Sequence, residues 1–149
     1  MTPLYSRPRK EEARVDKGPA SLEEAIKLIE EFRLPGGLLP LENVVECGHI
    51  KESGYVWITQ KKAIQHIFKK ISKQVSYGEN ITAYLEKGRL KKLTGVKAKE
   101  FLLWVSIVDI SLENPDAEPT EKEQDAKIHF KSFTGIGKTF PLKAFARGE

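Results

Sequence analysis

Cysteine is almost absent from this chain of 149 residues, because Cys47 is the only one. A single thiol can form no intrachain disulfide and cannot build a cysteine-based zinc site. The chain also lacks the run of roughly 20 apolar residues that a membrane-spanning helix needs. Its first segment, Met1 to Lys17, mixes basic and acidic side chains where a signal peptide would be apolar. These absences predict a cytoplasmic protein that folds without a disulfide, a metal or a cofactor.

Recognisable catalytic motifs are also missing. No Gly-x-Ser-x-Gly sequence is present, which disfavours an esterase of the α/β-hydrolase type. Residues 137–139 read Gly-Lys-Thr, but Ser132 stands where a phosphate-binding loop has its first glycine, so a hairpin turn fits better. Cys47 and His49 lie two apart on one predicted strand and could form a thiolate–imidazole pair. The sequence favours a protein that is not an enzyme, with no catalytic residue, and leaves this hydrolase-type pair as the alternative.

Lysine is concentrated in one stretch of the chain. The segment from Lys61 to Lys99 contains eleven Lys or Arg residues and only two acidic residues. Its net charge is +9, in a chain whose whole formal charge is +4. Clustered ammonium groups attract anionic surfaces, although lysine on strand edges also serves simply to prevent aggregation. The stretch predicts a ligand- or anion-binding set that consists of Lys61, Lys62, Lys69, Lys70, Lys87, Arg89, Lys91, Lys92, Lys97 and Lys99.

The expected partner of these residues is an anionic lipid or membrane surface, or a small amphipathic ligand. Nucleic acid is disfavoured, because arginine is scarce and no known nucleic-acid module surrounds Tyr77 and Tyr84. A second charged segment, residues 113–125, holds six acids and one lysine and predicts a solvated loop. This loop could bind a basic protein partner. No oligomeric state is predicted.

One amphipathic helix is predicted over residues 21–33. Its apolar positions recur at three- and four-residue spacing, and they are Leu22, Ala25, Ile26, Ile29 and Phe32. Ser21 followed by Glu24 has the spacing of a capping box, with Ser21 as the N-cap. Residues 1–19 are predicted to be a disordered arm, and residues 20–149 a single domain with an acidic loop at 113–126.

The rest of the chain predicts mainly strands. Alternation and turn residues indicate hairpins around residues 52–54, 87–88 and 134–137. The run Phe101–Val105, continuing through Ile107 and Val108, is apolar on both faces and predicts the most buried strand. Residues 63–75 fit a helix and a strand equally well. The fold class is therefore mostly β (α+β), with the N-terminal helix packed on a twisted antiparallel sheet that rolls into a barrel-like domain.

Three groups of motif residues follow one another along the chain. They are Leu34, Pro35, Gly37, Leu38, Leu39 and Pro40; then Gly88, Leu93, Gly95, Val96, Lys99 and Trp104; then Phe130, Phe140, Pro141 and Phe145. Over residues 21–145 the chain resembles the plant domain-of-unknown-function 538 family. Residues 52–54 with Trp57, Lys61 and Lys62 are similar to its lysine-rich branch, which is associated with trichome growth and stress responses.

The resemblance implies an N-terminal helix followed by a mostly β, barrel-like domain, with the motif residues in structural roles and no catalytic residues. Members of the family have been likened to the lipid-binding bactericidal/permeability-increasing proteins, which implies a lipid ligand at the level of fold analogy. Composition, charge and resemblance together predict a non-enzymatic β domain, linked to growth or stress response, that binds a lipid, another amphipathic ligand or a membrane surface.

Overall fold

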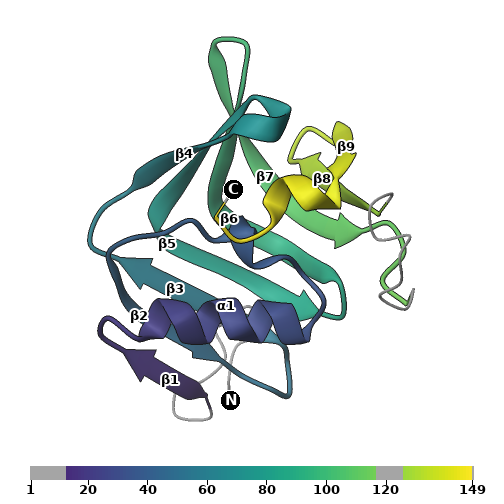
Figure 1. Ribbon diagram of the computed structural model, residues 1–149. Coiled ribbons are helices and arrows are strands. Elements are labelled where there is room, and N and C mark those ends of the chain that lie inside the picture. Colours follow the sequence, from purple (N-terminus) through teal and green to yellow (C-terminus); the bar gives the residue numbers. More distant parts are fainter. Residues whose placement is uncertain (1–12, 117–125, 149) are drawn as a thin grey trace, which may run out of the picture.

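The computed structural model describes residues 13–116 and 126–148, which form one antiparallel sheet of nine strands and one α-helix (Figure 1). The main elements are β1 (Arg14–Lys17), α1 (Ser21–Glu31), β2 (Val44–His49), β3 (Tyr55–Gln60), β4 (Ile64–Phe68), β5 (Lys73–Glu86), β6 (Arg89–Glu100), β7 (Leu103–Leu112), β8 (Lys127–Ser132) and β9 (Gly137–Pro141). Short 3₁₀ turns are η2 (Gly36–Leu38), η3 (Lys69–Ile71) and η5 (Leu142–Phe145). The mostly β fold predicted from the sequence is confirmed.

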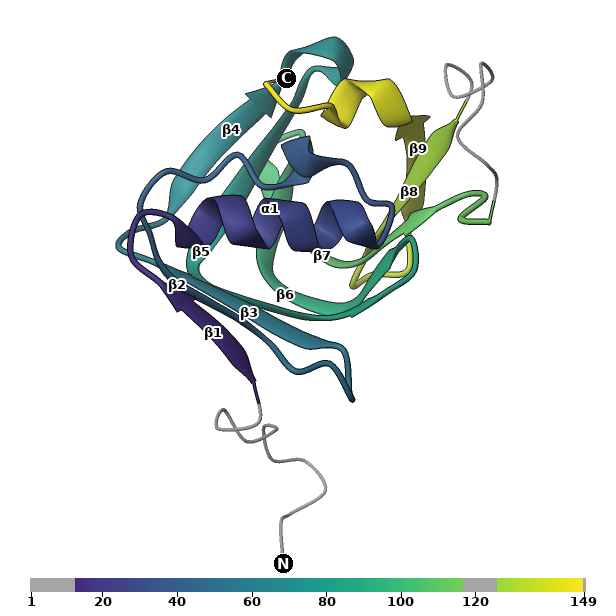
Figure 2. The same cartoon turned by 60° about the horizontal axis from the view of Figure 1, so that its bottom comes forward.

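The sheet is strongly curved but does not close on itself. Its strands follow the order β1-β2-β3-β5-β6-β7-β8-β9, and β4 pairs with β5 beside this path. The first and last strands of this order do not pair with each other, so the predicted barrel is not observed. The helix α1 lies within the concave face of the sheet, with η2 and η5 beside it (Figure 2). The apolar side of α1 must be buried, so the helix packs inside the curve of the sheet. A sheet closed into a barrel would leave no room for the helix there.

The helix matches its prediction except at its two ends. Its N-cap is Ala20, and Ser21 is the first helical residue, so the predicted capping box is wrong. Ser21 is fully buried and its hydroxyl donates a hydrogen bond to the Gly18 carbonyl at 2.6 Å. The helix ends at Glu31, two residues before the predicted end, because the chain reverses at Arg33 with φ 71°. Its inner residues Ala25 and Ile29 are buried.

The ambiguous segment 63–75 contains no α-helix. It forms the strand β4, the turn η3 and the start of β5, with Ser72 in the left-handed conformation at the reversal. Burial along β4 follows a period of two, because Phe68 is buried while Ile67 is exposed. The strand interpretation of this segment was therefore the right one.

The predicted strand from Phe101 to Val108 is buried only at Ile107, so the prediction that it is the most buried strand is wrong. Phe101 and Leu102 form the turn between β6 and β7, and the exposed fractions of Phe101, Leu102 and Leu103 are 96%, 89% and 71%. The buried positions of β7 lie further along the strand, at Ile107 and Ile110. An apolar run is buried only where another layer covers it, and this hairpin projects beyond the rest of the sheet (Figure 1).

Two predicted segments lie partly outside the described residues. Residues 1–12 of the expected disordered arm are not described, whereas Arg14–Lys17 of that arm forms β1 and pairs with β2. Residues 117–125 of the acidic loop are also outside the described part. No helix in residues 13–116 or 126–148 has the length and apolar character needed to cross a membrane.

Candidate functional site: an apolar cavity

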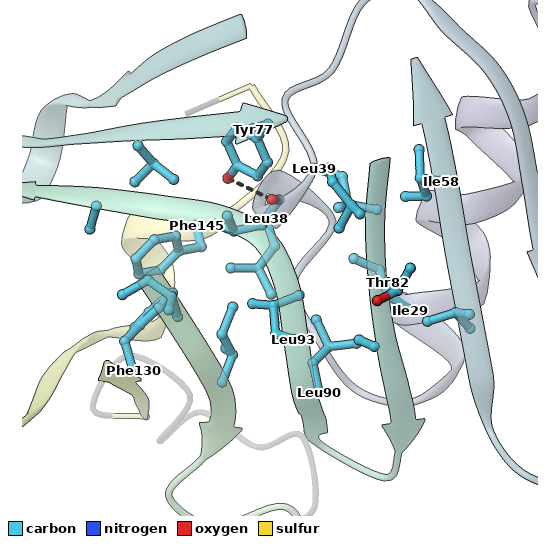
Figure 3. A pocket seen from close by; sticks show the side chains of 18 of the residues that line it. Ile29, Leu38, Leu39, Ile58, Tyr77, Thr82, Leu90, Leu93, Phe130 and Phe145 are labelled. Atoms are coloured by element: carbon cyan, nitrogen blue, oxygen red, sulfur yellow. Dashed lines mark hydrogen bonds between the residues drawn. The ribbon is translucent and has the colours of Figure 1, made fainter. Parts of the chain in front are cut away.

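An apolar cavity of about 520 Å³ lies between the concave face of the sheet and α1, η2 and η5 (Figure 3). The side chains that line it are mainly aliphatic and aromatic, and they include Ile29, Leu38, Leu39, Ile58, Leu90, Leu93, Phe130 and Phe145. Small-molecule sites in proteins usually have volumes of roughly 300–1,000 Å³ and are largely apolar. The size and the lining of this cavity are those of a ligand site.

The cavity is too large to be an ordinary packing defect. Natural cores are close-packed and leave few voids larger than a water molecule, whereas this space is many times that size. Unfilled space beside apolar side chains costs them packing contacts. Apolar walls also offer water few hydrogen bonds, which disfavours filling the space with solvent. An apolar ligand would relieve both penalties.

An aromatic cluster forms one wall of the cavity. Phe145, which is 1% exposed, packs against Phe68 and Phe130 with ring centroids 4.9 and 5.0 Å away. Phe140 lies beside Phe130 at 5.8 Å. Because these rings come from β4, β8, β9 and η5, they join the C-terminal segment to the far side of the sheet. The wall therefore ties the C-terminal turn η5 to three strands of the sheet.

Two buried polar side chains hold the backbone around the cavity. Tyr77 donates a hydrogen bond from its hydroxyl to the Leu38 carbonyl at 2.8 Å, and burial raises the pKa of this phenol, which therefore stays neutral. Gln60 donates from its amide nitrogen to the carbonyls of Tyr77 at 3.0 Å and Gly78 at 2.8 Å, where the pairing of β5 becomes irregular. These bonds fix η2 and β5 and leave the cavity walls apolar.

The cavity reaches solvent at the turns that join β6 to β7 and β8 to β9, because Phe101, Leu103 and Ile136 line it and are highly exposed. At this open end Glu100 accepts hydrogen bonds from Lys138 at 2.6 Å and from Lys73 at 3.0 Å. Desolvation opposes ionisation of Glu100, but the hydrogen bonds from Lys138 and Lys73 outweigh it and lower the pKa of this carboxyl. Two ammonium groups and one carboxylate therefore stand at the open end.

The opposite end of the cavity is bordered by an ion-pair cluster of β1 and α1 residues. Arg14 contacts Glu24 at 3.2 Å and Asp16 at 3.4 Å. Cys47 and His49 line the cavity nearby. This end therefore combines an ion-pair cluster with the two residues that the sequence offered as an alternative catalytic pair.

Cys47 and His49 do not form an activated nucleophile. The Cys47 thiol donates to the Ser21 carbonyl at 3.1 Å, and burial raises the pKa of this thiol to about 11, so it stays protonated at neutral pH. His49 packs edge-on against Phe32 with centroids 6.0 Å apart, and its Nε2 is buried with no hydrogen-bond partner among the described residues. Burial also lowers the pKa of His49, so the imidazole is neutral.

The predicted basic set does not form one surface. Around the turn between β5 and β6, the basic residues have acidic neighbours: Lys87 contacts Asp116 at 2.8 Å, Arg89 contacts Asp109 at 2.7 Å and Lys91 contacts Glu86 at 3.0 Å, while Lys92 lies 5.7 Å from the centre of the Tyr84 ring. We call residues 86–92 with Asp109 and Asp116 the paired end. Lys97 and Lys99 lie at the other end of β6, Lys69 and Lys70 lie in η3, and Lys61 and Lys62 lie in the loop before β4.

Half of the motif residues surround the cavity. Leu38, Leu39, Leu93, Val96, Phe130, Phe140 and Phe145 line it, and Leu34 is buried beside them. Gly37 packs so closely on the Phe145 carbonyl that a side chain would collide with it, and Gly88 and Gly95 have positive φ. Pro35 and Pro141 stand immediately before η2 and η5, whereas Trp104 is 37% exposed. The sequence marked these residues as structural but carried no signal that they enclose a space.

The fold and the site define a class of protein: a single curved antiparallel sheet that wraps one helix and forms an apolar cavity, which opens towards the turns joining β6 to β7 and β8 to β9. The chain belongs to the family described as "Protein of unknown function, DUF538", whose model matches residues 25–146. This match confirms the family predicted from the motif residues. No curated protein and no solved structure matches the chain.

Proposed function

We propose that the protein is a non-enzymatic binding protein for an amphipathic ligand that has one apolar chain and an anionic head group, such as a fatty acid or a single-chain lipid. The observation that carries this proposal is the cavity, whose walls are apolar and whose open end holds Lys73 and Lys138. The chain would lie among the aliphatic and aromatic side chains. The head group would replace Glu100 as the partner of one lysine.

The expected affinity follows from the apolar area that the ligand buries. Each buried methylene group contributes about 0.8 kcal/mol, so a chain of about ten methylenes gains on the order of 8 kcal/mol. Ordering the ligand reduces this gain, so dissociation constants of about 1 μM or weaker are expected. Such values suit a carrier or sensor that exchanges its ligand.

The resemblance to the lysine-rich branch supports a place for this activity in plant growth or stress responses. If a role in growth or stress response requires ligand binding, a variant with a blocked cavity should fail to restore normal growth in a plant that lacks the native chain. A variant that restores growth while binding no ligand would separate the two parts of the proposal.

Blocking the cavity near its open end tests the proposal directly. Ala98 lines the cavity and is paired with Val75 and Val105, so Ala98→Phe places a ring in the path of the ligand. The control is Ser76→Phe, because Ser76 follows Val75 on β5 and its side chain lies on the opposite face of the sheet.

The measurement is fluorescence titration with a fluorescent fatty acid, alongside circular dichroism to verify that both variants are folded. Ala98→Phe should weaken binding by at least about tenfold, whereas Ser76→Phe should stay within about twofold of the native chain. Equal affinities for all three proteins, or absence of binding to the native chain, would remove the proposal.

A further inference from the structure

Two turns at the open end of the cavity carry most of the exposed large apolar side chains. Of the nine such residues in the described part of the chain, six belong to these turns and the strand start beside them: Phe101, Leu102, Leu103, Trp104, Phe133 and Ile136. Soluble surfaces scatter such residues singly, and a cluster of them marks an interaction site. The cluster therefore needs a partner.

Pairing between the strands places the two turns together. Ser132 of β8 is paired with Ile107 of β7, and the Phe133 amide donates to the Ser106 carbonyl at 3.0 Å. The turn between β8 and β9 thus starts two residues from Trp104. The hairpin of β6 and β7 projects past it as a narrow tip (Figure 1). Its shape is that of an inserting loop and not of a flat interface.

The residue at this tip is a poor choice for the fold itself. Phe101 adopts φ 55°, a left-handed conformation that favours Gly or Asn and is strained for a bulky side chain. Its ring is 96% exposed and gains nothing from packing within the chain. Folding therefore gives no physical reason for phenylalanine here, whereas an apolar environment outside the protein would.

Basic residues surround the apolar cluster. We call residues 66–76, 97–106 and 131–138 the tip end, because strand pairing and the two turns bring these segments together. The tip end holds seven lysines and one acid, Glu100, which gives a net charge of +6. Within the described residues Lys69, Lys97 and Lys99 make no ion pair, and Lys99 lies 5.9 Å from the centre of the Trp104 ring.

We propose that the tip end docks on an anionic lipid bilayer, with Phe101 and Leu102 inserted below the head groups and the lysines beside the lipid phosphates. Near an anionic membrane each lysine strengthens binding about fivefold. An indole ring with a neighbouring ammonium group suits the boundary between the head groups and the acyl chains. This geometry uses the apolar side chains and the charge of the tip end together.

Docking in this orientation turns the open end of the cavity towards the membrane. A single-chain lipid could then move between bilayer and cavity without crossing water. This consequence rests on the proposed function, whereas the docking itself does not, because the inserted residues lie outside the enclosed part of the cavity. Ala98 belongs to the tip end by its position but lines the cavity, and Ala98→Phe alters neither an inserted side chain nor a lysine, so this variant should bind vesicles as the native chain does.

The first test measures co-sedimentation of the full chain with vesicles of phosphatidylcholine and phosphatidylserine. Phe101→Asn combined with Leu102→Ser should lower the partition coefficient by at least about tenfold. Asn tolerates the φ of residue 101, so the melting temperature should stay constant or rise. The matched control is Val15→Ser combined with Val45→Ser, which removes two exposed apolar residues from β1 and β2, and it should bind as the native chain does.

The second test follows the depth of Trp104. Phosphatidylserine vesicles with brominated acyl chains should quench its fluorescence, while Trp57, which is buried and bonded to Glu46 at 2.7 Å, should stay unquenched. Trp104→Phe should remove the quenching. The proposal is overturned if the tip variant binds vesicles as the native chain does, or if Trp104 is not quenched. It is also overturned if pure phosphatidylcholine vesicles bind as tightly, or if the tip variant abolishes only self-association, which would identify a second copy as the occupant.

Discussion

Both ends of β6 carry clustered basic residues, but the surroundings of these residues differ. At the paired end, Lys87, Arg89 and Lys91 each contact a carboxylate at 2.7–3.0 Å. At the tip end, roughly 20 Å or more along the same strand, Lys97 and Lys99 make no ion pair with a described residue and stand beside exposed apolar turns. The density of charge along a sequence therefore does not locate a binding surface. A binding surface is located by whether each charged side chain already has an oppositely charged neighbour.

The strongest contrast between the two ends is in core packing. Leu90 at the paired end is 6% exposed and lines the cavity, whereas Leu102 at the tip end is 89% exposed. Leu90→Ala should reduce the free energy of unfolding by about 2–5 kcal/mol, because it removes a buried side chain. Leu102→Ala should change it by no more than about 0.5 kcal/mol. Urea unfolding of both variants measures the difference, and similar losses would contradict the placement of the tip.

A smaller contrast is expected in membrane binding. Lys97→Glu combined with Lys99→Glu should weaken binding to phosphatidylserine vesicles by at least about 25-fold, a change of roughly 2 kcal/mol. Lys91→Glu combined with Lys92→Glu makes the same change in net charge at the paired end, far beyond the screening length of about 8 Å, and should alter binding by no more than about threefold. Equal effects in co-sedimentation would show that only total charge matters.

The smallest expected difference is in how acid changes the stability contributed by His49, near β1, and by Glu100, at the tip end. The pKa of His49, near β1, is lowered in the folded state, so stability should fall as the pH drops below 6.5 towards that folded value, by at most about 1.4 kcal/mol per pH unit. The pKa of Glu100 at the tip end is also lowered, so its contribution is complete above 4.5 and is lost as the pH falls through its folded value.

Thermal unfolding measured over a range of pH distinguishes the stability contributions of His49 and Glu100. His49→Gln should remove the decline below pH 6.5, and Glu100→Gln should remove the decline that begins below 4.5. An unchanged pH profile in either variant would contradict the role assigned to that residue.

The helix and the hairpins could be predicted from the sequence because their signals are local. The spacing of Ala25 and Ile29 places both on one buried face, and the turn at residues 52–54 lies between β2 and β3 as expected. The alternation around Phe68 is that of β4, but a helical pattern fits residues 63–75 equally well, so this segment could not be predicted from the sequence. Local periodicity follows directly from backbone geometry, which explains these successes.

The site could not be predicted because it depends on long-range packing. The run from Phe101 to Val105 has the composition of a buried strand, and only the position of the hairpin beyond the covered part of the sheet shows that it is exposed. The turn itself contains no Gly, Pro or Asn to mark it. The cavity depends in the same way on the curvature of the sheet around α1, so residues such as Leu93 could be assigned to the core but not to a cavity wall.

The most direct test of ligand binding is a methyl NMR titration of the full chain with a medium-chain fatty acid. Binding in the cavity should produce saturable chemical-shift changes for the methyl groups of Leu93 and Ile110, which line it, at fatty-acid concentrations below those that form micelles. Shifts confined to Leu102 and Ile136 on the exposed turns, or shifts that never saturate, would show that the fatty acid only adsorbs to the tip end and would contradict a cavity that binds ligand.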